Sequence, residues 1–481
     1  MKRVSGLPAN QQSLHLSSLE IMTSEKKKRI SGRAAGAYLD RSLIKEPLVL
    51  FFACMTISAG ILFGGAPNVP SWRLGIILVS ASALAASSVF AGSLKEVGGL
   101  GFFAKLFLLS IIILPLLQVI PLPPEIWKSF PGRDLELQLF QVANAGNDWH
   151  SISLNPIETL FVLVTVFPAA AVFLAGLKLN DTELRFLIVG TIFLAFFSII
   201  IGLFQFSTQG GVFNFYNSSH RQFLVGFFAN RNHQGLFLAI SLTLTIDFIV
   251  GKASNGRLGL IISGLAAFFF IGAVVATASR SGLALTVFAV FLVLIVKLRE
   301  SVGLGKLSAM IALASISCIA VFQSIGIIFN SVVDRYSAVD DDLRWQFWEQ
   351  SRLIIANYFP MGTGLGTFIP IYKQFEPLDQ IMPTFVNHVH NDYYELVLEA
   401  GLGGIIIPVL LLLALGQMIV SKILAQKSAM PSFHWAGLII VILILVHSIV
   451  DYPLRTQAIA IFFGLFLAVI FRNRANHVDD R

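Results

Sequence analysis

The chain contains little charge. Only 13% of its 481 residues are charged, whereas soluble domains carry about 25%. Hydrophobic residues make up 56% of the chain, so a soluble fold would have too little polar surface to cover itself. This composition excludes an ordinary water-soluble protein and predicts an integral membrane protein whose surroundings are the lipid bilayer.

Cysteine is also scarce, and we expect no cleavable secretory leader. Cys54 and Cys318 both lie in apolar runs with no metal-binding spacing, so we expect two free thiols. The first long apolar run begins near Leu48, which is too late and too long for a cleavable signal peptide. The net charge of +7 follows membrane topology, so we expect no nucleic-acid partner.

Apolar runs long enough to cross a bilayer recur along the chain. A transmembrane helix needs about 20 apolar residues. The sequence therefore predicts an all-α polytopic membrane protein with about 12 transmembrane helices. The predicted spans are Pro47–Ala66, Arg73–Gly92, Phe102–Ile120, Ile157–Leu177, Leu184–Phe206, Gln234–Val250, Leu258–Ala278, Gly282–Lys297, Leu307–Phe329, Tyr394–Val420, Trp435–Val450 and Ala458–Phe471.

The distribution of lysine and arginine predicts the orientation. These residues gather in the N-terminal segment, in the even-numbered loops and after residue 471, which indicates that both termini are cytoplasmic. We expect a basic tail over residues 1–46 that touches anionic lipid, a membrane domain over 47–471 and a short cytoplasmic tail over 472–481. The two long loops, 121–156 and 330–393, then face the periplasm, and the second is the larger.

Two arginines lie on the face where positive charge is disfavoured. Arg280 follows the predicted span that ends near Ala278, at a tight hairpin of three residues, Ser279-Arg280-Ser281. Arg344 lies in the large loop, on a predicted helix over Leu343–Asn357, with Trp348 one turn further on the same face. The alternatives are an interfacial anchor and an ordinary surface helix. A guanidinium that binds phosphate in bidentate fashion would also explain both positions.

Histidines and carboxylates gather where the large loop returns to the membrane. His388 and His390 precede a predicted helix that Asn391 starts, and Glu395 and Glu399 lie one turn apart on one face of it. Buried carboxylates there need arginine partners. An imidazole titrates near neutral pH and can take a proton from a hydroxyl. Half of a metal site is the alternative, but a third ligand is not evident.

Three further stretches have simpler interpretations. The glycine-rich segment Pro360–Phe368 lacks the spacing of a nucleotide-binding loop and predicts a tight turn with close backbone packing. Asn230-Arg231-Asn232-His233 marks the outer start of a helix, and His447 and Asp451 form a pair one helical turn apart, followed by Tyr452-Pro453-Leu454-Arg455. For the last two stretches we expect interfacial anchoring and capping.

The histidine stretch resembles the O-antigen ligase/polymerase family of bacterial envelope glycosyltransferases. That family typically shows a histidine followed by Asn, Ser or Gln, then nine residues, then Gly-x-x-Gly. Here the pattern reads His390-Asn391, nine residues, Gly401-Leu402-Gly403-Gly404. The supporting patterns are Ser279-Arg280-Ser281-Gly282, Phe228-Ala229-Asn230-Arg231-Asn232-His233, Arg344 ahead of Pro360–Phe368, and His447 followed by Asp451-Tyr452-Pro453.

The resemblance implies a fold similar to membrane (GT-C-like) glycosyltransferases. It implies metal-independent, inverting transfer of a glycan from a polyprenyl diphosphate to an acceptor hydroxyl, at the periplasmic face of the bacterial inner membrane and without a cofactor. The family histidine maps onto His390 as general base, and the family arginines map onto Arg280 and Arg344. The residues expected to bind substrate are Asn391, Glu395, Glu399, Arg231 and His388.

The acceptor stays open. The same pattern occurs in ligases to lipid A–core, in O-antigen and exopolysaccharide polymerases, and in protein O-glycosylating enzymes. A transporter or flippase for lipid-linked glycans is the alternative from another class. Transporters often show inverted repeats and interrupted helices in mid-membrane, whereas here no repeat is found and the polar residues cluster at the outer face.

Overall fold

The computed structural model describes residues 44–216, 220, 222–253, 257–298, 338–381, 385–424 and 432–472. Regular structure in these ranges is helical, apart from one bridge between Leu122 and His150, which confirms the all-α expectation. The longer helices of the bundle are α2 (Pro47–Phe63), α3 (Ser71–Phe90), α5 (Phe102–Val119), α8 (Pro156–Lys178), α9 (Asp181–Ser207), α10 (Arg231–Ala253), α11 (Arg257–Ala276), α12 (Arg280–Leu298), α17 (Leu402–Leu424), α18 (Ser432–His447) and α19 (Gln457–Phe471). The other helices are α4 (Ser93–Gly98), α6 (Pro124–Trp127), α7 (Asp134–Val142), α14 (Ala338–Tyr358), α15 (Phe368–Phe375) and α16 (Asp392–Ala400), with the 3-10 helices η3 (Leu378–Gln380) and η4 (Pro453–Arg455).

Among the described residues, five helices are long and apolar enough to cross a membrane: α3, α5, α8, α9 and α17. Shorter apolar helices are α2, α18, α19 and parts of α11 and α12. The predicted count of 12 spans remains a prediction, because the span at Leu307–Phe329 lies outside the described residues, as do most of both predicted tails.

The predicted span Tyr394–Val420 is wrong as one continuous helix. The structure divides it into α16 and α17 at Gly401, whose φ is 55°. A β-carbon on Gly401 would lie 2.0 Å from the carbonyl oxygen of Pro360. Only glycine adopts this left-handed backbone readily at such close range, so the chain turns here before it enters the apolar helix α17.

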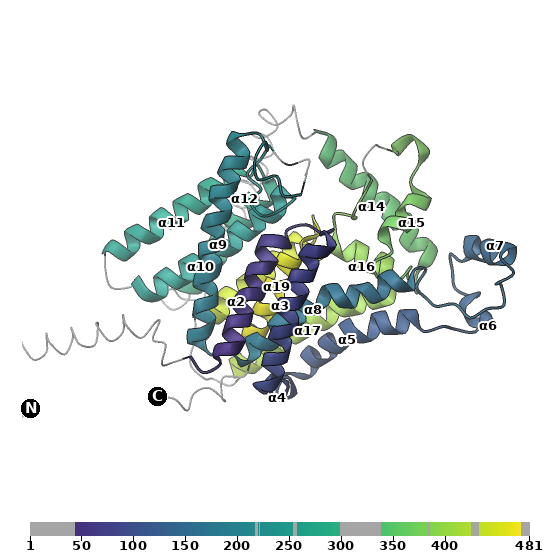
Figure 1. The fold of residues 1–481 in the computed structure, drawn as a ribbon, viewed down its shortest axis with the longest axis horizontal. Helices are drawn as coiled ribbons and strands as arrows, with labels where there is room; N and C mark the ends of the chain where they lie inside the picture. The colour runs from purple at the N-terminus through teal and green to yellow at the C-terminus, as the bar shows by residue number, and fades with distance from the viewer. Residues whose placement is uncertain are drawn as a thin grey trace, which may run out of the picture.

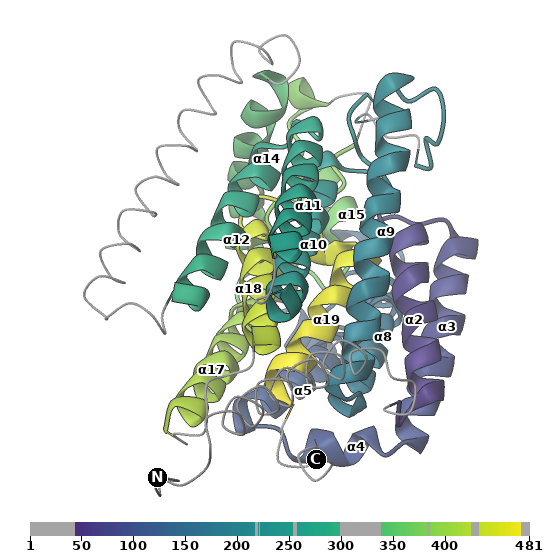
Figure 2. The ribbon, with the colours of Figure 1, turned by 90° about the vertical axis from the view of Figure 1, so that its left-hand side faces the viewer.

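Helix α19 forms the centre of the bundle (Figure 2) and packs against α8, α18 and α2. Its side chains are buried almost all round, and they include Phe462 and Phe466. A helix that is hydrophobic on every face is stable only when neighbours surround it. This central helix follows directly on η4, so its position fixes the turn that precedes it.

The hairpin at Arg280 has the predicted length of three residues but lies two residues earlier in the chain. Helix α11 ends at Ala276 and α12 begins at Arg280, so Arg280 opens the second helix instead of following the first. Gly235 of α10 and Gly282 of α12 touch: a β-carbon on either would lie 2.9 Å from the other's Cα. Small residues allow such close crossings in membranes, and this crossing brings the start of α10 beside the hairpin.

Helices α14, α15 and α16 gather at one end of the molecule (Figure 1), and α4 lies at the opposite end (Figure 2). Helices α14, α15 and α16 enclose a second, smaller apolar core that contains Tyr358, Phe368 and Val389. The turn Pro360–Phe368 packs closely, as predicted. A β-carbon on Gly362 would lie 2.5 Å from the carbonyl oxygen of Glu399, and one on Gly364 would lie 2.2 Å from the Ser153 hydroxyl.

Candidate active site

The spacing of the family pattern equals the length of one helix. Asn391 caps α16, because its Oδ1 accepts hydrogen bonds from the backbone N–H groups of Tyr393 and Tyr394, both at 3.0 Å. This confirms Asn391 as the helix start. The nine residues that follow are α16 itself, and Gly401 is its C-cap. The nine-residue spacing of the family pattern is therefore the separation between the N-cap Asn391 and the C-cap Gly401 of this helix.

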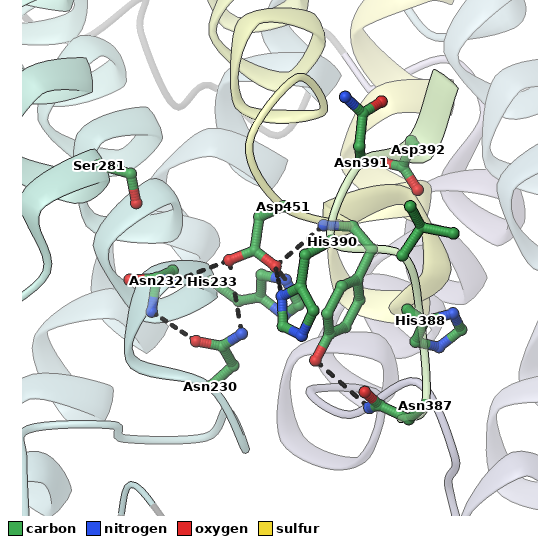
Figure 3. Close-up of polar contacts among 12 residues, drawn as sticks. Asn230, Asn232, His233, Ser281, Asn387, His388, His390, Asn391, Asp392 and Asp451 are labelled. Carbon is green, nitrogen blue, oxygen red and sulfur yellow. Dashed lines mark hydrogen bonds and ion pairs between the residues drawn. The ribbon is translucent and has the colours of Figure 1, made fainter. Parts of the chain in front are cut away.

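His390 stands immediately before this cap, in a conformation that is rare for its residue type. Its φ is 58°, in the left-handed region. Its Nδ1 lies 3.3 Å from Oδ1 of Asp451, and its side chain is 21% exposed. Figure 3 shows the ring directed at the Asp451 carboxylate, so Nε2 lies on the side of the ring away from that oxygen.

Asp451 is the centre of a polar cluster, which we call the Asp451 cluster. Asn232 donates a 2.9 Å hydrogen bond to its Oδ2 (Figure 3), and the Nε2 atoms of His233 and His447 lie 3.6 Å and 3.8 Å from the carboxylate. Burial would raise the pKa of Asp451, but His233 and His390 hold it well below its usual range. The carboxylate therefore stays charged.

Both predicted arginines lie on elements that adjoin this cluster. Ser279 donates a 2.8 Å hydrogen bond to Asn232 Oδ1, and the Ser281 hydroxyl lies 3.4 Å from His447 Nε2. These two serines flank Arg280, so its hairpin contacts the cluster on both sides. On the helix of Arg344, the Phe347 ring centroid lies 6.0 Å from that of the His390 ring. The structure thus brings the segments that carry His390, Arg280 and Arg344 to one region.

A second cluster, which we call the Arg455 cluster, holds the predicted carboxylates. The Arg455 guanidinium lies 3.1 Å from Glu399, 3.5 Å from Glu395 and 3.7 Å from Asp392. The sequence predicted arginine partners for the two glutamates, and Arg455 is that partner. His388 joins the cluster through a 2.7 Å contact between its Nδ1 and Glu395 Oε1.

Electrostatics distinguish the carboxylates of the Arg455 cluster. Burial would raise the pKa of Glu395, but Arg455 and His388 bring it to about 2. Burial dominates at Asp392 and raises its pKa to about 6, although Arg455 and the Ser448 hydroxyl oppose the shift. Glu395 is thus a fixed negative charge, whereas Asp392 takes up a proton near neutral pH.

Arg231, the remaining residue of the predicted substrate site, lies at the start of α10. Its guanidinium carbon stands 4.5 Å from the ring centroid of Phe223, a cation–π distance. Arg231 immediately precedes Asn232, so it lies one residue from the Asp451 cluster.

Comparison with protein families identifies the stretch that carries most of these elements. Residues 265–409 match the family model described as O-Antigen ligase, and this range includes His390, Arg280 and Arg344. This part of the chain is thus similar to an O-antigen ligase domain, which confirms over these residues the resemblance seen in the sequence. The match supports a glycosyltransferase-like ligase or polymerase of polysaccharide biosynthesis. Comparison with curated proteins gave no match.

Part of the site lies outside the matched range. Asn232, His233, His447 and Asp451 lie there, in stretches that support the family resemblance but for which the sequence predicts anchoring and capping. Their burial is the structural sign of another role, because His233, His447 and Asp451 are 0% exposed. The signal in the sequence was polar, ionisable residues at the ends of apolar helices, which are functional candidates by default.

The part of the chain that the structure describes shows no ready-made metal site. No group of three or more His, Cys, Asp or Glu side chains there has an arrangement that could hold a metal ion. The three imidazoles around Asp451 instead face its carboxylate at 3.3, 3.6 and 3.8 Å. The imidazoles therefore surround one carboxylate at ion-pair distance.

Proposed function

We propose that this chain is a metal-independent, inverting glycosyltransferase that moves a glycan from a polyprenyl diphosphate to an acceptor hydroxyl, at the periplasmic face of the bacterial inner membrane. The acceptor is a glycan or a lipid A–core. The observation that carries the proposal is an imidazole with a buried carboxylate behind it. His390 is 21% exposed, while its partner Asp451 is fully buried.

His390 acts as the general base in this proposal. Asp451 faces Nδ1, which favours the tautomer with the proton on Nδ1 and a free lone pair on Nε2. Nε2 takes the proton of the acceptor hydroxyl while the hydroxyl oxygen bonds to the anomeric carbon. The bond from that carbon to the diphosphate oxygen breaks on the opposite face, so the configuration inverts. A positioned base adds roughly 10²–10⁴-fold to such a step.

Arg280 and Arg344 stabilise the leaving diphosphate. Negative charge grows on its oxygens as the glycosidic bond breaks, and fixed cations lower the energy of that transition state. Guanidinium groups suit this task because they bind phosphate oxygens in pairs. Support comes from their placement. The hairpin of Arg280 contacts His447 of the Asp451 cluster, and the helix of Arg344 contacts His390 through Phe347.

The test of the proposal is glycan transfer by His390→Ala in membranes supplied with lipid-linked donor. We expect at least a hundredfold loss of transfer, with donor binding retained and lipid-linked precursor still present on the outer leaflet. A flippase would instead leave the precursor on the inner leaflet. EDTA should not change the rate. Transfer at the wild-type rate by His390→Ala, or loss in EDTA with recovery on adding a divalent metal, would contradict the mechanism.

The orientation is tested separately at Gln374, which is exposed on α15. A Gln374→Cys variant, in a background where Cys54 and Cys318 are serine, should react with an impermeant thiol reagent in intact cells. Labelling only after lysis would reverse the assignment of faces. The surface-glycan profile of a deletion strain then distinguishes a ligase, which leaves uncapped core, from a polymerase, which leaves short chains.

A further inference from the structure

The backbone of Val389, the residue just before His390, is held at both of its polar groups. The N–H of Val389 donates a 2.9 Å hydrogen bond to Oε2 of Glu395, and its carbonyl oxygen accepts a 3.1 Å hydrogen bond from the Trp348 indole. The Val389 side chain is itself fully buried in the small apolar core. Backbone and side chain of this residue are therefore both immobilised.

The residue that follows needs such support. A histidine with φ of 58° is in a region that side chains with a β-carbon rarely adopt. Such conformations persist only where the surrounding structure determines them, and they concentrate at functional sites. On the far side, Asn391 is fixed as the cap of α16 and donates a 2.8 Å hydrogen bond to the Ile449 carbonyl. The Val389 contacts provide the support on the near side.

The two sides of this support come from different elements. Glu395 belongs to α16, where Arg455 and His388 hold its carboxylate. Trp348 belongs to α14 and lies four residues after Arg344, one helical turn further on the same face. The indole hydrogen bond therefore connects the helix of a diphosphate-binding arginine to the backbone of the general base.

We propose that Trp348 and Glu395 are positioning residues that hold His390 in its left-handed conformation, and that Trp348 makes the placement of the base depend on the docking of α14. This inference rests on the proposed role of His390. It implies that the helix carrying Arg344 and the loop carrying His390 are set together, so a donor bound to Arg344 meets a base that is already in place.

The test is Trp348→Phe, which removes the indole N–H and keeps an aromatic ring. We expect kcat to fall about 10- to 100-fold, since displacement of a catalytic group by about 1 Å can cost that much, while KM for the lipid-linked donor changes less than twofold. Trp345→Phe is the matched control. Trp345 lies three residues earlier on α14 and is 68% exposed, and its replacement should leave both constants within twofold.

A double-mutant cycle separates positioning from general damage. In a His390→Ala background, Trp348→Phe should cause no further loss of the residual rate, because the group it positions is gone. Glu395→Gln, which weakens the other side of the support, should lower kcat in the wild-type background and likewise lose its effect in His390→Ala. Rates are normalised to the monodisperse protein recovered in detergent.

Two results would overturn the inference: wild-type kcat in Trp348→Phe, or an equal loss from Trp348→Phe with and without His390. A wild-type rate in His390→Ala is a different outcome. It refutes the proposed general base itself, whatever Trp348→Phe does, so the two failures are distinguishable.

Discussion

Two buried charge clusters meet at Tyr452, and they are built in opposite ways. The Asp451 cluster surrounds one carboxylate with three imidazoles. The Arg455 cluster surrounds one guanidinium with three carboxylates. The Tyr452 ring packs between them, with its centroid 4.7 Å from that of His390 and 4.5 Å from that of His388.

The difference shows which cluster can do chemistry. An imidazole gains or loses a proton near neutral pH, whereas a guanidinium stays charged under all working conditions. One ring of the Asp451 cluster is also accessible to a substrate, because His390 is partly exposed while His233 and His447 are buried. The Arg455 cluster holds its carboxylates inside and ties α16 to η4. One cluster is suited to move a proton, and the other to hold the first in place.

The largest expected effect comes from breaking the Arg455 cluster. Arg455→Ala leaves three buried carboxylates without their cation, and loss of one partner of a buried ion pair costs about 3–5 kcal/mol. We expect little folded protein in the membrane and a sharply lower melting temperature in detergent. Arg352→Ala, at an exposed arginine on α14, is the control and should melt like the wild type. A normal melting temperature for Arg455→Ala would show that the cluster is not structural.

Neutralising the centre of the Asp451 cluster should affect turnover more than stability. Asp451→Asn retains the size of the side chain and its bond to Asn232, but it removes the charge that faces the His390 imidazole. We expect kcat to fall by about 10²–10⁴ with melting temperature within a few degrees of the wild type. A steady-state assay with lipid-linked donor measures this. A loss confined to KM would instead place Asp451 in substrate binding.

The sequence singled out the members of the Asp451 cluster but could not show that they meet, and the reason is distance along the chain. His390, Asn391 and Gly401 are local to one helix, so their spacing alone revealed them. Asn232, His447 and Asp451 meet His390 only because α10, α18 and the loop before α16 pack together. No local pattern encodes that packing. Arg455 was missed as a partner of Glu395 for the same reason, since 60 residues separate them.

The helices themselves were easier to predict because apolar length is a local property. Predicted spans such as Phe102–Ile120 coincide with observed helices to within a few residues. The break at Gly401 was not foreseen, since hydropathy continues across it. Its cause is a backbone contact with Pro360, a residue of a different loop.

Substitution of Arg280 or Arg344 should have an intermediate effect on activity. Arg280→Lys and Arg344→Lys keep the charge but lose the bidentate geometry, so we expect kcat/KM to fall about tenfold in each. The alanine variants should lose more. Isothermal titration calorimetry with a short polyprenyl diphosphate shows whether each variant loses donor affinity. Arg352→Lys is the control. Full activity of both Arg280→Ala and Arg344→Ala would remove these residues from the mechanism.

The smallest effect is expected at Asp392. Burial raises the pKa of Asp392 from its ordinary value of 3.8 to about 6 in the folded protein, so the folded protein binds the proton more tightly than the unfolded chain does. The contribution of protonated Asp392 to the free energy of unfolding is therefore lost as pH rises from about 4 to about 6. Asp392→Asn stays neutral, so it should remove this part of the pH dependence and change turnover at pH 7 less than about threefold.

Melting temperatures between pH 4.5 and pH 7 provide the measurement. In this window Glu395, whose pKa is about 2, remains charged and contributes its full stabilisation. The wild type should become less stable than Asp392→Asn as pH rises. Parallel curves for the two proteins would show that Asp392 does not titrate in this range.

The length of helix α16 makes the site sensitive to insertions and deletions more than to substitutions. Each residue added to or removed from an α-helix rotates everything beyond it by about 100° and shifts it by about 1.5 Å. One insertion between Asn391 and Gly401 would therefore move the Gly401 turn away from Pro360. It would also change the position at which α17 enters the bilayer. Substitutions at its exposed position Tyr394 leave that register intact. A change in the number of residues along this short segment would thus do more harm than most changes in their kind.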